Sequence, residues 1–178
     1  MAIPTFSAVG FCAHYSKQGD WAFDLALELS KAHNVKLNVF HFLTDPFDPN
    51  DTRAMDLSSS ELKKLAIAEE KKLRLYYDDR AGKYLDVGFR VCFDSSWVEL
   101  HRCLIIREFQ LLVLGYAQKG AYFADKPIEE FADNFISPVI LVGPDTQDQL
   151  FFNSRATLIS QNLRLDEKIL HNAKIVYI

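Results

Sequence analysis

The sequence predicts an α/β domain built on an open parallel sheet of five strands, with helices on both faces. Five short β-prone segments alternate with segments of helical periodicity, a pattern typical of parallel strands joined by right-handed crossovers. Residues 111–115 (LLVLG) are wholly apolar, as expected of a strand buried on both faces. Ligands of such sheets bind beyond the carboxyl ends of the strands, so a binding loop is expected after Gly115.

The first half of the domain begins with residues 6–13 (FSAVGFCA), whose apolar and β-prone character predicts the first strand. We expect Asp20 to cap the helix that follows. That helix should end near Asn34, because Asn tolerates the left-handed conformation of a C-cap. Residues 35–43 (VKLNVFHFL) predict the second strand, and residues 44–57, rich in Asp, Asn and Pro, predict a loop.

The second helix is predicted to run from a capping box of Ser58 and Glu61 to about Ala81. Its many charges are typical of a solvated helix face. Residues 87–93 (VGFRVCF) predict the third strand. A third helix is expected over residues 97–108, capped by one of the two serines before it.

The fourth strand, residues 111–115, is followed by a loop and then by a helix over residues 127–135, with Pro in its first turn. Residues 139–142 (VILV) predict the fifth strand, which a Gly-Pro pair ends. Residues 1–144 are therefore expected to form one α/β domain.

Residues 145–178 lie outside this alternation and are expected to form a C-terminal extension. Residues 156–160 and 173–178 predict short strands that cover the edge of the sheet or support dimerisation, with a helical turn in residues 163–170. Phe151 and its neighbour Phe152 are expected to anchor the extension on the domain or on a second subunit.

The composition limits which binding partners and which cellular compartment are expected. The 178 residues carry a net charge of −4, which gives no electrostatic case for nucleic acid or an anionic membrane. No apolar run reaches the roughly 18 residues that span a bilayer, and the N-terminus lacks the features of a signal peptide. Three widely spaced cysteines argue against a disulfide framework, so we expect a cytoplasmic protein.

Four segments resemble the universal stress protein family, and His41 matches a histidine often found near the end of that family's second strand. The segments correspond to the first helix and to the second, fourth and fifth strands: residues 22–30 (AFDLALELS), 35–42 (VKLNVFHF), 111–115 and 137–142 (SPVILV). The resemblance covers about residues 6–144. It implies the three-layer sandwich of adenine nucleotide alpha hydrolase-like proteins, a homodimer paired through its last strand, and a regulatory or stress-response role without catalysis.

The ATP-binding members of that family have an Asp at the end of the first strand and a loop of the form Gly-x2-Gly-x9-Gly-Ser/Thr after the fourth. Here His14 falls in place of the Asp and Gln118 in place of the second Gly. Acidic Asp125 or Glu129 falls at the final Gly-Ser pair, depending on the direction of counting. Glycines let backbone N–H groups approach phosphate oxygens, and carboxylates repel them. The sequence therefore predicts a divergent member without the usual ATP loop.

The resemblance still implies a candidate, degenerate nucleotide pocket, and ATP or AMP remains an alternative ligand. A weak ATPase activity would follow only if a nucleotide is bound. The residues that would line this pocket are Ala13, His14, Ser16, Phe42, Gly115 and Lys119.

Cys12 and His14 are a further candidate, because residues two apart on a strand point to the same face. Such a pair can act as nucleophile and base, or contribute two ligands to a metal site. The chain would then be a small hydrolase or redox protein. The simpler interpretation is that Cys12 packs as a small apolar residue and that His14 ends the strand. Packing is also expected of Cys92 and Cys103.

Overall fold

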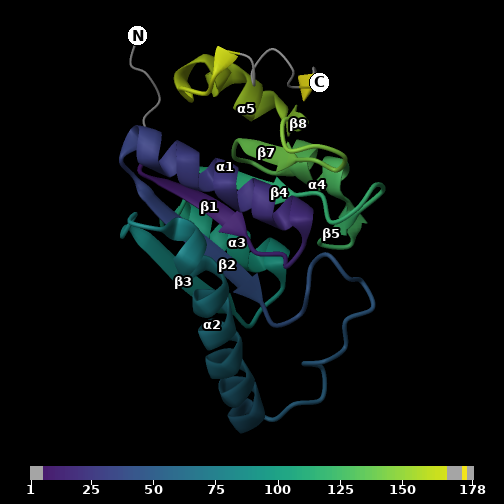
Figure 1. Ribbon diagram of the computed structural model, residues 1–178. Helices are drawn as coiled ribbons and strands as arrows, with labels where there is room; N and C mark the ends of the chain where they lie inside the picture. Colours follow the sequence, from purple (N-terminus) through teal and green to yellow (C-terminus); the bar gives the residue numbers. More distant parts are fainter. Residues whose placement is uncertain (1–5, 168–173, 176–178) are drawn as a thin grey trace.

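A mixed seven-stranded sheet forms the centre of the computed structural model, which describes residues 6–167 and 174–175 (Figure 1). Its order is β3-β2-β1-β4-β7-β8-β9. The first five of these strands are parallel, as predicted. They are β1 (Ala8–Cys12), β2 (Lys36–Phe42), β3 (Val87–Cys92), β4 (Leu111–Gly115) and β7 (Val139–Val142). Strands β2 and β3 lie on one side of the β1–β4 pair, and β7 lies on the other. The direction in which strands are added therefore reverses at this pair, and ligands of open parallel sheets bind at such a switch point.

Helices cover both faces of the sheet and enclose two separate hydrophobic cores. One core packs against α1 (Lys17–His33), α2 (Ser59–Ala81) and α5 (Ser154–Ile159), and the other against α3 (Ser96–Ile105) and α4 (Ile128–Asn134). Adjacent residues of β4 enter opposite cores, Val113 the first and Leu114 the second, as the alternation of a strand requires. The predicted three-layer arrangement is therefore confirmed.

Helix α1 begins four residues earlier than predicted. Ser16 caps it, with its Oγ accepting a hydrogen bond from the Gly19 N–H at 2.9 Å. The predicted cap, Asp20, lies inside the first turn and accepts a hydrogen bond from the hydroxyl of Tyr76 at 2.7 Å. The helix ends as predicted, with Asn34 in the left-handed region at a φ of 52°.

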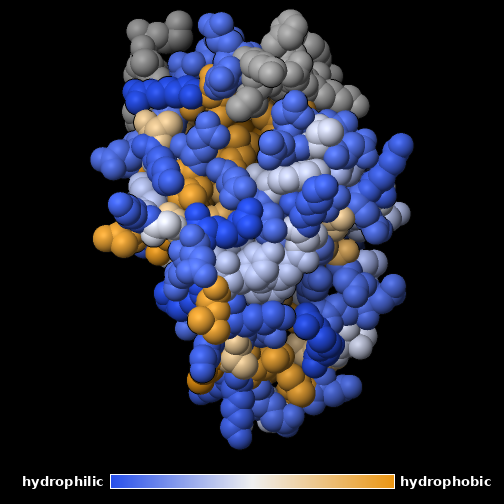
Figure 2. All heavy atoms as spheres, in the orientation of Figure 1, coloured by the Kyte–Doolittle hydropathy of each residue, from blue (hydrophilic) through white to orange (hydrophobic). Residues whose placement is uncertain are grey.

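Helix α2 has the predicted boundaries, and Ser58 and Glu61 form its capping box. Its amino-terminal half projects beyond the sheet, as Figure 1 shows. The outer surface of this helix is mostly hydrophilic, with small separate hydrophobic areas (Figure 2). Ile67 and Leu75 are large hydrophobic residues of this helix that are exposed. The charged residues of α2 thus form the solvated face that was expected.

Two other helix boundaries differ from the prediction. Helix α3 starts at Ser96 and ends at Ile105, three residues early, because Arg107 adopts a φ of 62° that no α-helix continues through. Helix α4 starts at Ile128, so Pro127 precedes the helix instead of lying in its first turn.

The loop before α4 contains a hairpin that the sequence did not predict. It is formed by β5 (Tyr122–Phe123) and β6 (Lys126–Pro127). Its turn residues Ala124 and Asp125 both have positive φ, 52° and 64°. Such turns are usually marked by Gly or Asn, which explains why an Ala-Asp turn escaped recognition.

The described part of the C-terminal extension continues the sheet. β8 (Leu150–Phe152) pairs antiparallel with β7, and β9 (Lys174–Ile175) pairs parallel with β8. The outer edge of β7 is therefore covered by the chain itself. Phe151 and Phe152 are 7% and 0% exposed and enter opposite cores, so they anchor the extension on the domain.

The secondary structure predicted for the rest of the extension needs one correction. Residues 156–160 belong mainly to helix α5, not to a strand, because Asn153 caps a helix there by accepting from the Ala156 N–H at 2.9 Å. Of the strand predicted over residues 173–178, the structure describes only Lys174–Ile175. Of the helical turn predicted in residues 163–170, residues 163–166 are not helical, and Arg164 has a φ of 58°. Residues 168–170 lie outside the described residues, and a 3₁₀ turn at Ser160–Asn162 precedes this segment.

Candidate functional site

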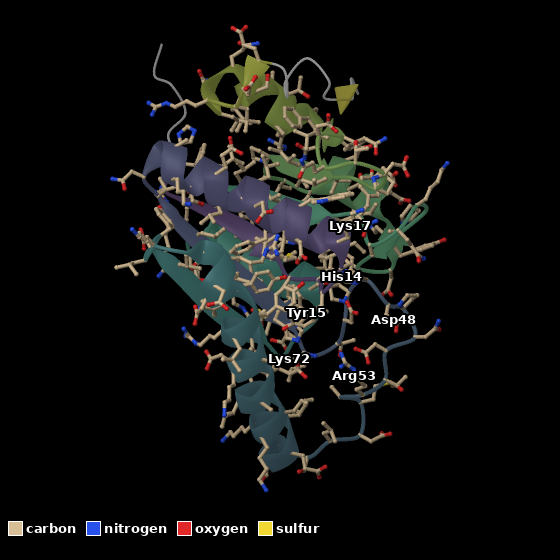
Figure 3. The ribbon with its side chains drawn as sticks, in the orientation of Figure 1. His14, Tyr15, Lys17, Asp48, Arg53 and Lys72 are labelled. Atoms are coloured by element: carbon tan, nitrogen blue, oxygen red, sulfur yellow. The ribbon has the colours of Figure 1, made fainter. Side chains whose placement is uncertain are left out.

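A cavity of about 470 Å³ lies at the carboxyl ends of β1 and β2. Its walls are the end of β1 (Ala13, His14, Tyr15), the end of β2 (His41, Phe42), the loop of residues 45–53, and Glu69 and Lys72 of α2. In Figure 3 the labelled side chains from β1, α2 and the loop lie around this region. The cavity lies at the carboxyl edge of the parallel sheet, where ligands of such sheets bind, but beside β1 and β2 and not after Gly115 as predicted.

The loop of residues 45–53, which forms one wall of the cavity, is stabilised by hydrogen bonds between its own residues. Asp51 Oδ2 accepts from the Asp45 N–H at 2.8 Å, and Asp45 Oδ1 accepts from the Phe47 N–H at 2.9 Å. Arg53 binds both carboxylate oxygens of Asp51, at 2.9 and 3.1 Å. These hydrogen bonds, led by that of Arg53, lower the pKa of Asp51 to about 2. The carboxylates of Asp45 and Asp51 therefore stabilise the conformation of the loop through these hydrogen bonds.

Phe47 attaches this loop to the body of the protein. Its side chain is nearly buried, with its ring centroid 4.6 Å from that of His14 and 4.9 Å from that of Phe123. The Ala124 N–H donates to the carbonyl of Pro46 at 3.0 Å beside it. Phe47 thus fills the space between the end of β1 and the β5–β6 hairpin. It was not among the predicted site residues, although a single Phe in a loop of Asp, Asn and Pro was a signal.

His14 and Ser16 are tied to each other and to the start of α1. His14 Nδ1 lies 2.8 Å from Ser16 Oγ, which also accepts the N–H of Gly19. Burial lowers the pKa of His14, and the nearby Asp45 carboxylate offsets only part of this. The Ser16 hydroxyl can therefore donate to Nδ1 of a neutral imidazole. A hydroxyl held in this way caps the helix and is not free to attack a substrate.

His41 faces Glu69 across the cavity wall, with Nε2 and Oε2 3.1 Å apart. This distance allows an ion pair when His41 is protonated, and Nε2 is buried without another partner among the described residues. Burial lowers the pKa of His41, although Glu69 acts in the opposite direction. A largely neutral His41 therefore presents a polar nitrogen that is poorly satisfied by the protein.

Tyr15 is the second such group on the wall. Its Oη is buried and has no hydrogen-bond partner in the described part of the chain. Burial, followed by the charge of Glu69, raises the pKa of Tyr15 to about 12, so the phenol stays protonated. The ammonium of Lys72 lies 4.7 Å from the centre of its ring. Unsatisfied buried polar atoms beside a cavity are what a bound ligand or water satisfies.

The charges around the cavity oppose a polyphosphate. The lining includes four carboxylates but only two permanent cations, Arg53 and Lys72. Arg53 is already paired with Asp51. Because both histidines are held largely neutral, they add little positive charge at pH 7. The cavity therefore favours an uncharged or cationic ligand over a triphosphate.

Three of the six residues predicted to line one nucleotide pocket, Ala13, His14 and Phe42, line this cavity. Ser16 is not in the lining, although its Oγ lies 2.8 Å from His14 Nδ1, and it caps α1. Lys119 lines a different hollow, of about 270 Å³, beside Tyr116 and Glu129.

Gly115, the sixth predicted residue, is needed for packing. A Cβ at this position would lie 2.5 Å from the carbonyl oxygen of Gln18 and 3.0 Å from the nitrogen of Gly19. The first turn of α1 thus sits directly on the end of β4.

The alternative built on Cys12 is not supported. Cys12 is 1% exposed in the core with Phe40, and burial raises the pKa of its thiol well above the ordinary value. A thiolate nucleophile requires the opposite shift and access to solvent. Within residues 6–167 and 174–175, no cluster of His, Cys, Asp and Glu has the arrangement of a metal site. In the same residues, no helix combines the length and apolar character needed to cross a membrane.

Among known proteins, only solved structures are found to resemble this chain. No family model matches the sequence, and no curated protein matches it. Among solved structures, a universal stress family protein from Burkholderia pseudomallei superposes with a TM-score of 0.56 at 17% identity, covering 78% of this chain and 97% of that one. The fold is that of the universal stress proteins. UspA from Lactobacillus plantarum gives a TM-score of 0.52 at 18% identity, over 79% of this chain and all of that one.

Proposed function

We propose that this protein is a divergent universal stress protein that acts in regulation or the stress response by binding a ligand or a partner protein. In this proposal it is not an enzyme and does not hold ATP in the mode usual for the family. The observation that carries the proposal is the packing of Phe47 against His14 and Phe123, because this ring occupies the route from the cavity toward the loop after β4.

Two further observations support the absence of a phosphate site after β4. The hydroxyl of Tyr116 donates to Glu129 Oε1 at 3.1 Å, which places a carboxylate beside the loop that would have to receive phosphate. The contact of Gly115 with the main chain of Gln18 leaves no space there for an anion. A phosphate needs the reverse, namely open N–H groups and positive charge.

The test is thermal unfolding with ATP, ADP, AMP and adenosine, each with magnesium. A ligand at 100 times its Kd stabilises the folded state by about 2.7 kcal/mol, which corresponds to about 5–10 °C in the Tm of a chain of this size. We expect no shift with ATP or ADP. A saturable rise in Tm with ATP, lost when magnesium is chelated, would show that the family's usual mode operates here.

A second candidate is an adenosine-like or AMP-like ligand confined to the cavity. The buried, unpartnered Oη of Tyr15 and Nε2 of His41 favour it, because ligand hydroxyl or ring nitrogen atoms can satisfy both. The acidic lining predicts that adenosine binds more tightly than AMP, which carries two added negative charges. Tyr15→Phe is the matched variant, since it removes only the hydroxyl. If the affinity of adenosine is unchanged in Tyr15→Phe, this candidate is wrong.

We also propose a cytoplasmic homodimer that makes no contact with nucleic acid or membranes. The three cysteines are free and buried, which suits a reducing compartment. Because β8 covers the outer edge of β7, pairing must use a surface other than the last parallel strand. Light scattering at micromolar concentration tests the oligomeric state, and a clean monomer would contradict the dimer.

A further inference from the structure

A second hollow, of about 400 Å³, lies at the opposite edge of the sheet, near the amino ends of β1, β2 and β3. Helix α3 ends at Ile105 and leaves this part of the sheet face without a helix over it. On this face the side chains that precede the core residues of β2 and β3 are polar, Asn38 before Phe40 and Arg90 before Cys92. A face that is hydrophobic further along the same strands thus becomes hydrophilic at this edge.

The floor of the hollow depends on a glycine. Gly88 of β3 is the register partner of Asn38. A Cβ on Gly88 would lie 2.6 Å from Asn38 Oδ1 and 2.9 Å from Cε of Lys36. A glycine within a strand often marks the close approach of another group. Here it lets the side chains of Lys36 and Asn38 lie across β3. Asn38 is fixed in turn by donating from Nδ2 to the carbonyl of Glu108 at 2.6 Å.

The charge of this hollow is opposite to that of the cavity at the carboxyl edge. Three cations line it, Lys36, Arg90 and Arg107, against a single carboxylate, that of Glu108. Glu108 Oε1 is 2.6 Å from Nη2 of Arg90, so one cation is neutralised. Within the described residues, Lys36 and Arg107 form no ion pair. A chain with a net charge of −4 therefore leaves two uncompensated cations at one hollow.

The position of Arg107 has a conformational cost. Its φ of 62° lies in the left-handed region, which is strained for a residue other than glycine. Glycine would adopt this conformation without strain, so the helix terminus alone does not explain an arginine here. The strained backbone places the guanidinium at the hollow that also holds Lys36.

We propose that this hollow binds a phosphate-type oxyanion, either inorganic phosphate or the phosphate group of a small monoester. Lys36 supplies a point charge and Arg107 a planar pair of donors, the two kinds of group that proteins use for phosphate. The Arg90–Glu108 pair forms a fixed wall and limits the net positive charge, so the site suits one phosphate group and not a polyanion. The site is separate from the cavity at the carboxyl edge and does not depend on what binds there.

The experiment is a titration of the full chain with inorganic phosphate and, separately, with glycerol 3-phosphate, followed by NMR of the amide signals of residues 88–90 and 107. Sodium chloride at matched ionic strength is the control for screening. We expect saturable shifts with both phosphates and none with chloride. Saturation with the ester at a lower concentration than with inorganic phosphate identifies a phosphate ester as the favoured ligand, and the reverse identifies free phosphate.

The matched variants are K36Q/R107Q, which removes the two unpaired cations, and K63Q/K64Q, which makes the same charge change on the exposed face of α2. We expect the first to weaken phosphate binding about tenfold or more, because each lost charge-assisted contact is worth about a decade, and the second to leave it unchanged. Equal weakening in both variants, or shifts reproduced by chloride, would overturn the site. If R107Q fails to fold, the phosphate affinity of K36Q alone tests the site, because Lys36 is exposed at the start of β2 and its replacement should not disturb folding.

Discussion

The ring of Phe47 packs against the imidazole of His14 with their centroids 4.6 Å apart. This contact joins the long loop after β2 to the end of β1, where the family resemblance placed an ATP-binding aspartate. The residue that replaces the aspartate therefore serves as a packing surface for the loop.

Phe47→Ala is expected to destabilise the protein by about 3 kcal/mol, the lower end of the range for a buried Phe, because the ring is at the surface end of its core. Denaturant unfolding measures the change. The loop should also become a faster target for trypsin at Arg53. Phe93→Ala is the matched control, since Phe93 is 51% exposed, and we expect less than about 0.5 kcal/mol. Equal effects of the two variants would refute the attachment role of Phe47.

Gly115→Ala is expected to cost about 1–3 kcal/mol, because its Cβ would overlap the main chain of Gln18 and backbone cannot move aside cheaply. Gly120→Ala is the comparison. No atom lies within 4 Å of a Cβ at Gly120, but its φ is 72°, so only the left-handed strain of about 1 kcal/mol applies. Thermal and urea unfolding of both variants provide the measurement. A Gly115→Ala protein as stable as the wild type would mean that the first turn of α1 is not seated on β4.

The stability of the protein is expected to fall as the pH is lowered below about 6.5, the ordinary pKa of histidine. Burial lowers the pKa of both His14 and His41 in the folded state. The unfolded chain therefore binds protons first, and protonation favours unfolding. The stability is fully present above pH 6.5 and decreases as the pH falls toward the folded pKa values.

Urea unfolding at a series of pH values from 8 to 5 measures this dependence, and the double variant H14Q/H41Q is the control. Removing both rings should flatten the slope between pH 6.5 and 5. If the slope is the same in wild type and variant, the two histidines are not the groups that carry it.

Cys12 is expected to resist alkylation in the native protein at neutral pH, because its buried thiol has a raised pKa. Cys92 and Cys103 are also buried with raised thiol pKa values and should behave alike. Counting of reactive thiols before and after denaturation is the measurement, with three thiols appearing only on unfolding. Rapid labelling of Cys12 in the folded protein would reopen the nucleophile hypothesis.

Local patterns in the sequence predicted the parallel core closely. The strands over residues 111–115 and 139–142 and the helix that ends at Ala81 have the predicted boundaries. Apolar runs, a capping box at Ser58 and a left-handed Asn34 are determined by neighbouring residues, so a sequence displays them directly. Helix α5 was predicted as a strand because its few apolar residues fit the periodicity of a strand as well as that of a helix. The N-cap at Asn153 favours the helix.

The site depended on contacts between segments far apart in the chain. By itself the sequence determined that a parallel sheet with the order and spacing of universal stress protein strands forms, and that His14 lies just after the first strand. Only the tertiary structure decided that Phe47 packs on His14, that Gly115 supports α1, and that Lys119 lies in another hollow. The physical reason is that periodicity and caps are set by residues a few positions apart. The contents of a cavity are set by which side chains meet after the sheet has brought distant segments together.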